Sequence, residues 1–292
     1  MSQPALPVVV NRSSGAAGVL AERLEAELRE AFAAAGVEID LTLAEGAEIG
    51  TALERVAGAS VVAVGGGDGT VGQAVGVLAA NGSALGVLPL GTRNHLARQL
   101  SLPLDLEGAA KVIAAGKRER VDYARIGQRS WINNASVGLY ARMVTARDAA
   151  GGPKWLATIP AAWSVLRHLE QRRLTLVLDG ATQRVKTPLL FVGNNRYSLD
   201  GGRIGERESL SDGTLAVYAL APKSAGQLVG FALRTLLGRA DPARDFVALA
   251  EAGSLTIEGV GEIRVALDGE VEKLPLPLEF AIMPGALEVI VP

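Results

Sequence analysis

The sequence predicts an α/β protein in which an N-terminal doubly wound α/β domain is followed by an antiparallel β domain. Three observations support this prediction. Short apolar runs alternate with helical patterns until about residue 120. After about Asp122, short alternating runs separated by turn residues dominate. Several early apolar runs end directly in glycine or polar residues, as strands of a parallel sheet do at a ligand-binding edge.

The first part of the chain has the periodicity of strands connected by helices. Leucine or phenylalanine recurs every four residues from Leu20 to Phe32, which is one face of a helix, and Gly36 can end that helix. The other segments follow the same reasoning. We expect strands at 7–10, 37–43, 60–64 and 85–88, and helices at 49–56 and 71–80.

The second part of the chain has the pattern of an antiparallel sheet, with turn pairs such as Asp179-Gly180 and Asp212-Gly213 between its runs. Helical patterns interrupt it at 154–169 and 224–237. The expected domains are therefore 1–122 and 123–292, and the last residues could pack back on the first domain. Strands are expected at 174–178, 189–192, 215–220, 254–258, 263–267 and 287–291.

Composition excludes several classes of protein. The 292 residues are 49% apolar and 21% charged, which indicates a globular chain. A net charge of −2 gives no reason to expect a nucleic-acid partner. The absence of cysteine excludes disulfides and thiolate chemistry, and two histidines are too few for a His-rich metal site. The first residues do not have the pattern of a signal peptide, and no apolar run is long enough to span a bilayer.

The strongest chemical signal is the segment 65–70, Gly-Gly-Gly-Asp-Gly-Thr, between a strand and a helical pattern. Glycines allow close approach of a ligand to the backbone, and the N–H groups of the turn and of the following helix form an anion site. Asp68 could contact a phosphate-bound Mg²⁺. The Gly-Lys-Ser/Thr of a Walker A loop is absent, so this is a different kind of phosphate loop.

Two further turns end neighbouring strands of the expected sheet. Residues 88–97 again run from a strand through Gly-Thr into a helical pattern, and residues 11–15 follow the first strand. Each turn alone could be a helix cap or an ordinary loop. Because ligands of doubly wound sheets bind at the carboxyl ends of strands, the three turns together indicate a nucleotide site.

These motifs carry a family resemblance. Asn11–Gly15, Gly66–Thr70 and Pro89–Thr92 resemble the nucleotide-binding motifs of the diacylglycerol kinase catalytic-domain family, which includes bacterial lipid kinases and sphingosine kinases. Later segments agree in order: Asn134–Gly138, Ser211–Leu215 and Asp268–Glu270. The resemblance implies an ATP-binding α/β domain followed by a β-sandwich-like domain, with ATP in the cleft between them. It also implies Mg²⁺ and ATP-dependent phosphorylation of a lipid hydroxyl, as in diacylglycerol.

The resemblance implies a set of site residues. Glu270 is the expected general base, and Asp68 is its expected partner at the metal-bound phosphates. A structural Mg²⁺ is expected at the carbonyl of Ser209, the side chain of Asp212 and the carbonyl of Thr214. ATP contacts are expected from Asn11, Arg12, Ser13, Ser14, Gly15, Thr42, Gly66, Gly67, Asp68, Gly69, Thr70, Val71, Gly72 and Thr92.

Two positions depart from the family pattern. The family usually has Asn where this chain has Gly72, and Asp where this chain has His95. A Gly-Thr-x-Asn-His version resembles a bacterial subgroup, so we do not interpret His95 as a sign of inactivity. The departures leave the lipid substrate and the metal dependence open.

Other interpretations remain. An NAD kinase would share the Gly-Gly-Asp-Gly-Thr loop, and a non-catalytic ATP- or lipid-binding regulator could retain the fold. Basic residues in 142–173 and 223–244, with Trp155 and Trp163 at helical spacing, suggest peripheral contact with anionic lipid. We expect a cytoplasmic protein, with contact at the inner membrane face and a homodimer left open.

Overall fold

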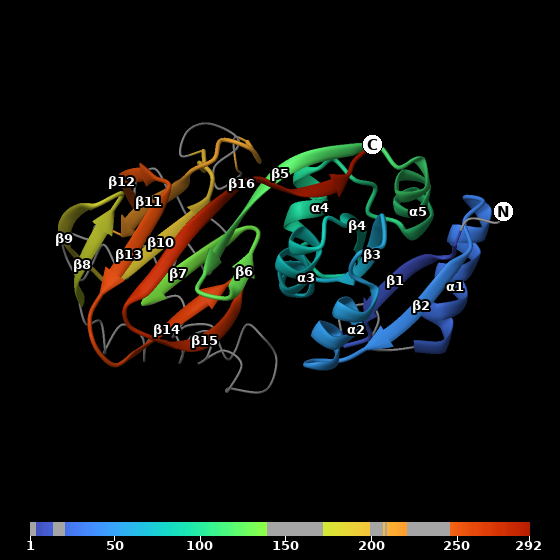
Figure 1. The fold of residues 1–292 in the computed structure, drawn as a ribbon, viewed down its shortest axis with the longest axis horizontal. Coiled ribbons are helices and arrows are strands. Elements are labelled where there is room, and N and C mark those ends of the chain that lie inside the picture. The colour runs from blue at the N-terminus through green and yellow to red at the C-terminus, as the bar shows by residue number, and fades with distance from the viewer. Residues whose placement is uncertain (1–3, 14–20, 139–171, 199–206, 208, 221–245) are drawn as a thin grey trace, which may run out of the picture. The chain divides into compact units, whose positions relative to one another are not determined.

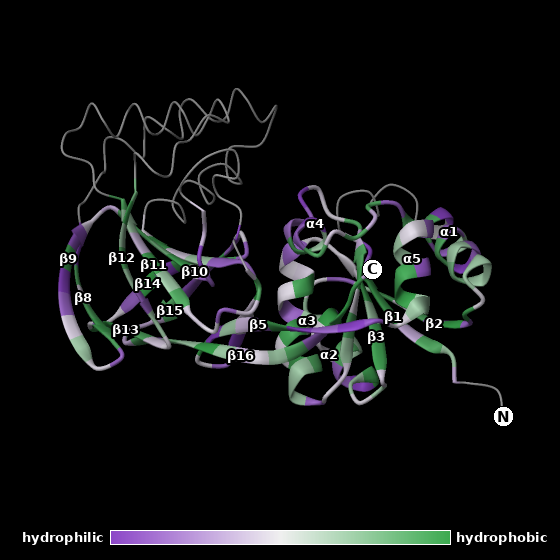
Figure 2. Ribbon diagram, turned by 90° about the horizontal axis from the view of Figure 1, so that it is seen from above, coloured by the Kyte–Doolittle hydropathy of each residue, from purple (hydrophilic) through white to green (hydrophobic). Residues whose placement is uncertain are grey.

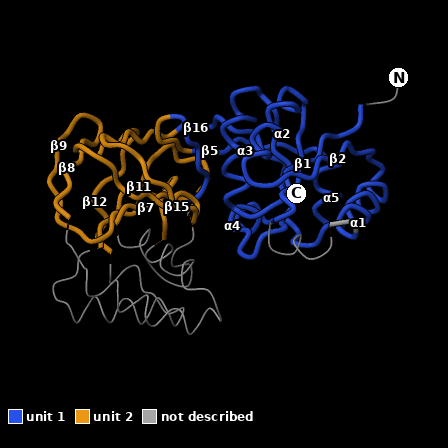
Figure 3. The backbone as a smooth tube through the Cα atoms, turned by 90° about the horizontal axis from the view of Figure 1, so that it is seen from below, with its two compact units in different colours: residues 1–123, 128–133, 283–292 blue, residues 124–127, 134–282 orange. Residues whose placement is uncertain are grey.

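The computed structural model describes residues 4–13, 21–138, 172–198, 207, 209–220 and 246–292. These residues form two compact units (Figure 3). Unit 1 comprises residues 1–123, 128–133 and 283–292, and unit 2 comprises residues 124–127 and 134–282. The domain boundary expected after residue 122 is close to the end of the first segment of unit 1 at residue 123. Residues 283–292, at the end of the chain, also belong to unit 1.

Unit 1 is built on a parallel sheet whose strands are connected by helices (Figure 1). The sheet has the order β2-β1-β3-β4, and the end of β16 adds to β4 in parallel. Its elements are β1 (Leu6–Asn11), α1 (Ala21–Ala34), β2 (Ile39–Ala44), α2 (Glu48–Val56), β3 (Val61–Gly66), α3 (Asp68–Ala80), β4 (Ala84–Pro89), α4 (His95–Gln99), α5 (Leu106–Ala115) and β6 (Arg129–Trp131). Two further strands, β5 (Arg118–Ile126) and β16 (Leu278–Ile290), belong partly to unit 1 and partly to unit 2.

Helices cover both faces of this sheet, which makes the unit doubly wound. Val8 and Val10 of β1 share an apolar cluster with Leu28 and Phe32 of α1 and with Ile113 of α5. On the other face, α2 contacts both β1 and α3. Figure 2 shows the strands β1 and β3 in hydrophobic colours, as expected for strands buried on both sides.

The strand β16 passes through a Pro-Gly pair that would ordinarily indicate a turn. The strand continues because the buried carboxylate of Asp122 accepts a hydrogen bond from the Gly285 N–H at 2.6 Å. Gly285 has a φ of 55°, which favours glycine. The strand expected at 287–291 therefore covers only the end of β16.

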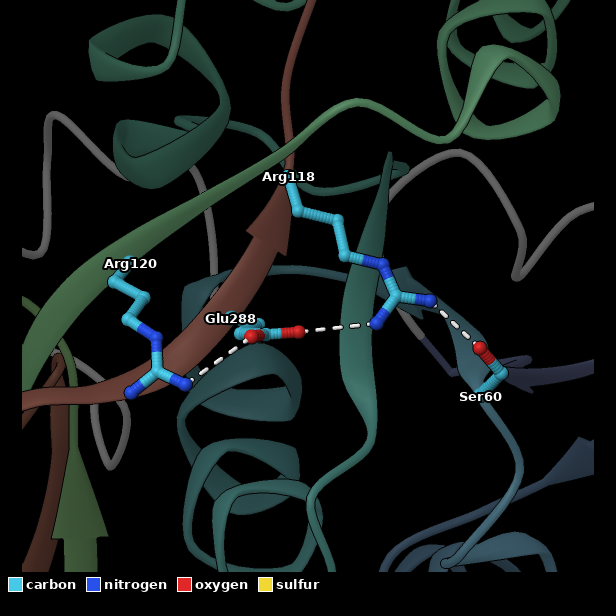
Figure 4. A network of polar contacts seen from close by, with 4 residues as sticks. All are labelled: Ser60, Arg118, Arg120 and Glu288. Atoms are coloured by element: carbon cyan, nitrogen blue, oxygen red, sulfur yellow. Dashed lines mark hydrogen bonds and ion pairs between the residues drawn. The ribbon is translucent and has the colours of Figure 1, made fainter.

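The neighbouring end of β5 is held by an exposed polar network (Figure 4). Arg118 and Arg120 bind the two carboxylate oxygens of Glu288 at 3.0 and 3.4 Å, and Arg118 also donates to Ser60 Oγ at 2.6 Å. Exposed ion pairs contribute roughly 0–1 kcal/mol each. We therefore assign this network a role in aligning β5, β16 and the start of β3 rather than in overall stability.

Unit 2 contains two sheets of mainly antiparallel strands (Figure 1). In one sheet β13 pairs with β8 and with the start of β16, and β8 pairs with β9; the other has the order β12-β11-β10-β7-β14-β15. Its elements are β7 (Asn134–Gly138), β8 (Arg172–Leu178), β9 (Ala181–Thr187), β10 (Leu189–Asn194), β11 (Leu215–Leu220), β12 (Phe246–Ala252), β13 (Ser254–Glu258), β14 (Glu262–Leu267) and β15 (Glu270–Pro275).

Two helices also differ from the expected elements. Helix α3 begins at Asp68 rather than Val71, because the glycine loop leads directly into the first helical turn. Helix α5 was not expected, although its caps are visible in the sequence: Asp105 accepts from the Gly108 N–H, and Gly116 has a φ of 70°. The helical patterns at 154–169 and 224–237 lie outside the described residues. In the described part of the chain, no helix combines the length and apolar character that a membrane span requires.

Candidate active site

Three loops of unit 1 follow adjacent parallel strands and so lie at one edge of the sheet. They are the ends of β1, β3 and β4, which are neighbours in the order β1-β3-β4. Gly65 pairs with Val10 on one side and with Leu88 on the other, and Gly66 pairs with Pro89. The three turns identified in the sequence are therefore close enough to contact one ligand.

The loop after β3 is packed so closely that side chains are excluded from it. A Cβ on Gly66 would lie 2.6 Å from Cβ of Thr70, and a Cβ on Gly91 would lie 2.5 Å from Cα of Gly67. The loops after β3 and β4 thus meet backbone to backbone. Gly67 is the N-cap of the 13-residue helix α3, whose first N–H groups have no partner within the helix. This combination suits a phosphate group.

The turn after β4 is organised by Asn94, a residue with a φ of 50°. Its Oδ1 accepts from the Gly91 N–H at 2.9 Å, and its Nδ2 donates to the carbonyls of Pro89 and Gly91 at 3.1 and 2.8 Å. Asn tolerates the left-handed conformation better than most residues. Asn94 therefore shapes the turn itself. Thr92 and His95 are both exposed beside it.

The first loop is connected to α3 through Asn11. Its Nδ2 donates to Oγ1 of the buried Thr70 at 3.0 Å, and its Oδ1 accepts from the Ser13 N–H at 2.9 Å. Arg12 is exposed and forms an ion pair with Glu45 at 2.6 Å. Asn11 therefore holds the loop after β1 against the first turn of α3.

Asp68 is the half-buried first residue of α3, and its carboxylate is held in place from two sides. Its Oδ1 accepts from the Leu96 N–H at 3.3 Å and from the Asn133 side chain at 3.4 Å. Asn133 is 3% exposed. Sequence reasoning did not select Asn133, although it directly precedes the Asn134–Gly138 motif.

The hairpin residue Ser130 contacts α3 at two glycines and explains one of them, Gly76. Its hydroxyl donates to the Gly72 carbonyl and accepts from the Gly76 N–H, both at 3.1 Å. A Cβ on Gly76 would lie 2.6 Å from that hydroxyl oxygen. At Gly72, where the family usually has Asn, the structure thus shows a backbone contact to Ser130.

The other expected ATP contacts have the following positions. Thr42 lies half-buried in β2, opposite Val9. Gly69 is half-buried and Val71 is buried in the first turn of α3. Ser14 and Gly15 lie outside the described residues.

In unit 2, the expected general base Glu270 is the first residue of β15, and its side chain is exposed. The turn before it has positive φ angles at Asp268 and Gly269, 47° and 94°. Asp268 exchanges two hydrogen bonds with Asn134: its N–H donates to the Asn134 carbonyl at 3.0 Å, and its Oδ1 accepts from the Asn134 N–H at 3.1 Å. Asp268 thus fixes the hairpin to β7.

The Asn134 side chain also bonds the half-buried side chain of Tyr197. Burial raises the pKa of its hydroxyl, while the charge of Arg207 and a hydrogen bond with the Asn134 side chain act in the opposite direction. The hydroxyl of Tyr218 accepts from the Tyr197 N–H at 3.0 Å. Asn134 therefore connects the Asp268 turn to a buried polar network.

The turn expected to hold a metal ion lies beside this network. Asp212 is exposed and Gly213 has a φ of 71°. The Thr214 N–H donates to Asn195 Oδ1 at 3.2 Å, and the Asn195 N–H donates to the Thr214 carbonyl at 2.9 Å. The Ser211 N–H donates to Ser209 Oγ at 3.1 Å. A carboxylate and carbonyls are the hard oxygen donors that Mg²⁺ prefers, so this turn fits the ion.

Comparison with known proteins gives the context for this geometry. Residues 5–126 match the diacylglycerol kinase catalytic domain, and residues 134–291 match the YegS C-terminal NAD kinase beta sandwich-like domain. A diacylglycerol kinase from Mycobacterium tuberculosis is 31% identical over 245 residues, covering 80% of this chain and 78% of its own. The chain belongs to the diacylglycerol kinase family.

Other relatives agree with this membership. A YegS-like lipid kinase from Pseudomonas aeruginosa is 30% identical over 246 residues, which are 81% of this chain and 78% of that protein. A solved structure of a diacylglycerol kinase from Bacillus anthracis str. Sterne has a TM-score of 0.69 at 21% identity, over 99% of this chain and 97% of that one. The last likeness confirms the expected fold of an α/β domain followed by a β-sandwich-like domain.

Proposed function

We propose that this chain is an ATP-dependent lipid kinase, a phosphotransferase that phosphorylates a hydroxyl of diacylglycerol or a related lipid. The observation that carries the proposal is the phosphate loop: Gly66, Gly67 and Gly91 bring two backbones together at the N-terminus of α3. Family membership makes a nucleotide phosphate the natural ligand of this loop, and the family relatives are named as lipid kinases.

The residues of unit 1 would bind and orient ATP. The N–H groups at the start of α3 would donate hydrogen bonds to phosphate oxygens. The site would be completed by the other expected contacts, at residues 11–15, Thr42, residues 66–72 and Thr92. Asp68, already oriented by Leu96 and Asn133, would position Mg²⁺ at the phosphates. Bound there, Mg²⁺ would neutralise charge on the transferring phosphoryl group.

We assign the general base to Glu270. A lipid hydroxyl is a weak nucleophile at neutral pH, so a carboxylate that accepts its proton as the bond to phosphorus forms assists transfer. Glu270 is exposed at a turn that Asp268 and Asn134 hold in one conformation, so it is accessible to a substrate. Asp268 itself has a supporting role.

We also propose the structural Mg²⁺ at Ser209, Asp212 and Thr214, and peripheral membrane contact by unit 2. The basic segments 142–173 and 223–244 that suggested this contact lie outside the described residues. A lipid substrate, a cytoplasmic location at the inner membrane face and a place in phospholipid biosynthesis are consistent with these proposals, and a homodimer stays a hypothesis.

One experiment tests the proposed reaction. The purified chain is incubated with labelled ATP, Mg²⁺ and a total lipid extract, and the labelled product is identified by mass spectrometry. The expected product is a lipid phosphate monoester. In a parallel reaction NAD replaces the lipid. Labelling of NAD alone would establish the NAD kinase alternative, and ATP binding without turnover on either acceptor would establish a non-catalytic regulator.

The metal turn has a test that does not depend on activity. The thermal stability of unit 2 is followed with Mg²⁺ and with a chelator, for the native chain and for Asp212→Asn. We expect Mg²⁺ to raise the unfolding temperature of the native chain and to leave that of the variant unchanged. Equal stability of the native chain in both conditions would contradict this metal site.

A further inference from the structure

Unit 2 contains a polar pocket of about 210 Å³ that none of the proposed functions uses. Its volume is below the roughly 300–1,000 Å³ of pockets for drug-sized ligands, so it suits a small group. Its lining comes from β7, β8, β14 and β15, and therefore from both sheets of the unit. The lining residues are Gly138, Arg172, Glu262, Ile263, Arg264 and Lys273.

Three cations and one carboxylate face this pocket, and two of the cations are direct neighbours. Arg264 of β14 and Lys273 of β15 lie opposite each other in the antiparallel pair. Like charges in this arrangement destabilise a sheet. Within the described part of the chain, neither side chain has an ion pair or a side-chain hydrogen bond, and the same holds for Arg172 and Glu262. A bound anion would remove this repulsion.

Gly138 contributes backbone and no side chain to the lining of this pocket. Val137 lies opposite Val265, so the next residue of β7 in this antiparallel pairing, Gly138, lies beside Arg264. Gly138 has a φ of 107°, and a Cβ there would lie 2.4 Å from the Pro188 carbonyl oxygen. A side chain is therefore excluded at this position.

We propose that this pocket is a binding site for a phosphate group, carried either by a phospholipid headgroup or by a soluble phosphate ester. Arginine donates to phosphate oxygens through a planar fork, and lysine adds a compact positive charge. Arg172 and Arg264 from different sheets, with Lys273, would surround such a group. Glu262, two residues from Arg264, adds one negative charge to a lining that keeps an excess of positive charge.

The test uses two matched double variants of the full chain. Arg264→Gln with Lys273→Gln removes two charges from the pocket. The control, Arg184→Gln with Lys186→Gln, removes two charges from the exposed strand β9 of the same unit. Circular dichroism confirms that both variants fold. Binding is then measured in two arms: to vesicles containing phosphatidylglycerol against vesicles of phosphatidylcholine alone, and to glycerol 3-phosphate by calorimetry.

Each outcome decides the proposal. If the pocket takes a lipid headgroup, the pocket variant binds anionic vesicles about 30-fold more weakly than the native chain, and the control changes by less than about threefold. If the source is a soluble ester, the pocket variant loses glycerol 3-phosphate binding and keeps its vesicle binding. The proposal is overturned if the pocket variant matches the native chain in both arms, or if both double variants weaken equally.

Discussion

The side chain of Asn133 donates a hydrogen bond to Oδ1 of Asp68 at 3.4 Å, although 65 residues separate them. The Leu96 N–H contacts the same oxygen. Asn133 is nearly inaccessible to solvent, so its amide has few competing water partners. The carboxylate proposed to position Mg²⁺ is thereby oriented by residues from two other segments of unit 1.

Replacing Asn133 with Ala should lower kcat/KM for Mg-ATP by about tenfold. A hydrogen bond to a charged group contributes roughly 1.5–3 kcal/mol, and the long 3.4 Å contact favours the lower end of this range. Steady-state kinetics at varied Mg-ATP provide the measurement. Asn81→Ala is the matched control, because Asn81 is exposed and its side chain donates to the Val77 carbonyl at the end of α3. Equal kinetics of the two variants would show that Asn133 does not position Asp68.

Gly91→Ala should abolish detectable ATP binding while leaving a folded protein. The new Cβ would lie 2.5 Å from Cα of Gly67, so the two loops must separate and the backbone of the phosphate loop must move. Calorimetric titration with ATP measures the effect. The control is Gly50→Ala in α2, where no atom lies within 4 Å of the added Cβ. That variant should bind ATP normally and gain roughly 0.5–1 kcal/mol of stability. Normal ATP affinity in Gly91→Ala would refute the assignment of this loop.

Asp179 gives unit 2 a stability that depends on pH. The N–H of Gly253 bonds its Oδ2 at 3.0 Å, and the N–H and hydroxyl of Ser254 bond its Oδ1 at 2.8 and 3.0 Å. The Gly253 bond is the largest cause that lowers the pKa of this carboxyl below its ordinary 3.8. Because the folded pKa is the lower one, the stabilisation is present above pH 3.8 and is lost as pH falls through the folded value.

Asp179→Asn should therefore unfold at a lower temperature than the native chain at neutral pH. Asn suits the left-handed φ of 46° at this turn, so the substitution changes charge with little backbone strain. The difference should shrink as pH falls below 3.8. Thermal unfolding at a series of pH values measures it, with Asp40→Asn on the exposed face of β2 as control. A difference that stays constant across the series would contradict the linkage.

The sequence predicts the layers of this fold because strand and helix periodicities are local. Leu28 and Phe32 identify α1, and Val8 and Val10 identify β1, from spacing alone. The same reasoning locates the phosphate loop, since its glycines are contiguous in the chain. It does not identify Asn133 or Ser130, because their roles arise from contacts 65 and 58 residues away along the chain. The pocket at Arg264 likewise depends on strand register, which no local pattern specifies.

Glu270→Gln should keep the affinity for ATP and lose most of kcat on the identified lipid, by about 10²–10⁴-fold. The amide has the same shape but cannot accept the hydroxyl proton. Asp68→Asn should in addition weaken Mg-ATP binding, because Asp68 belongs to the phosphate loop and Glu270 to unit 2. Glu258→Gln, at the exposed end of β13, controls for loss of a carboxylate from unit 2. Near-normal kcat in Glu270→Gln would exclude Glu270 as the base and make Asp68 the leading candidate.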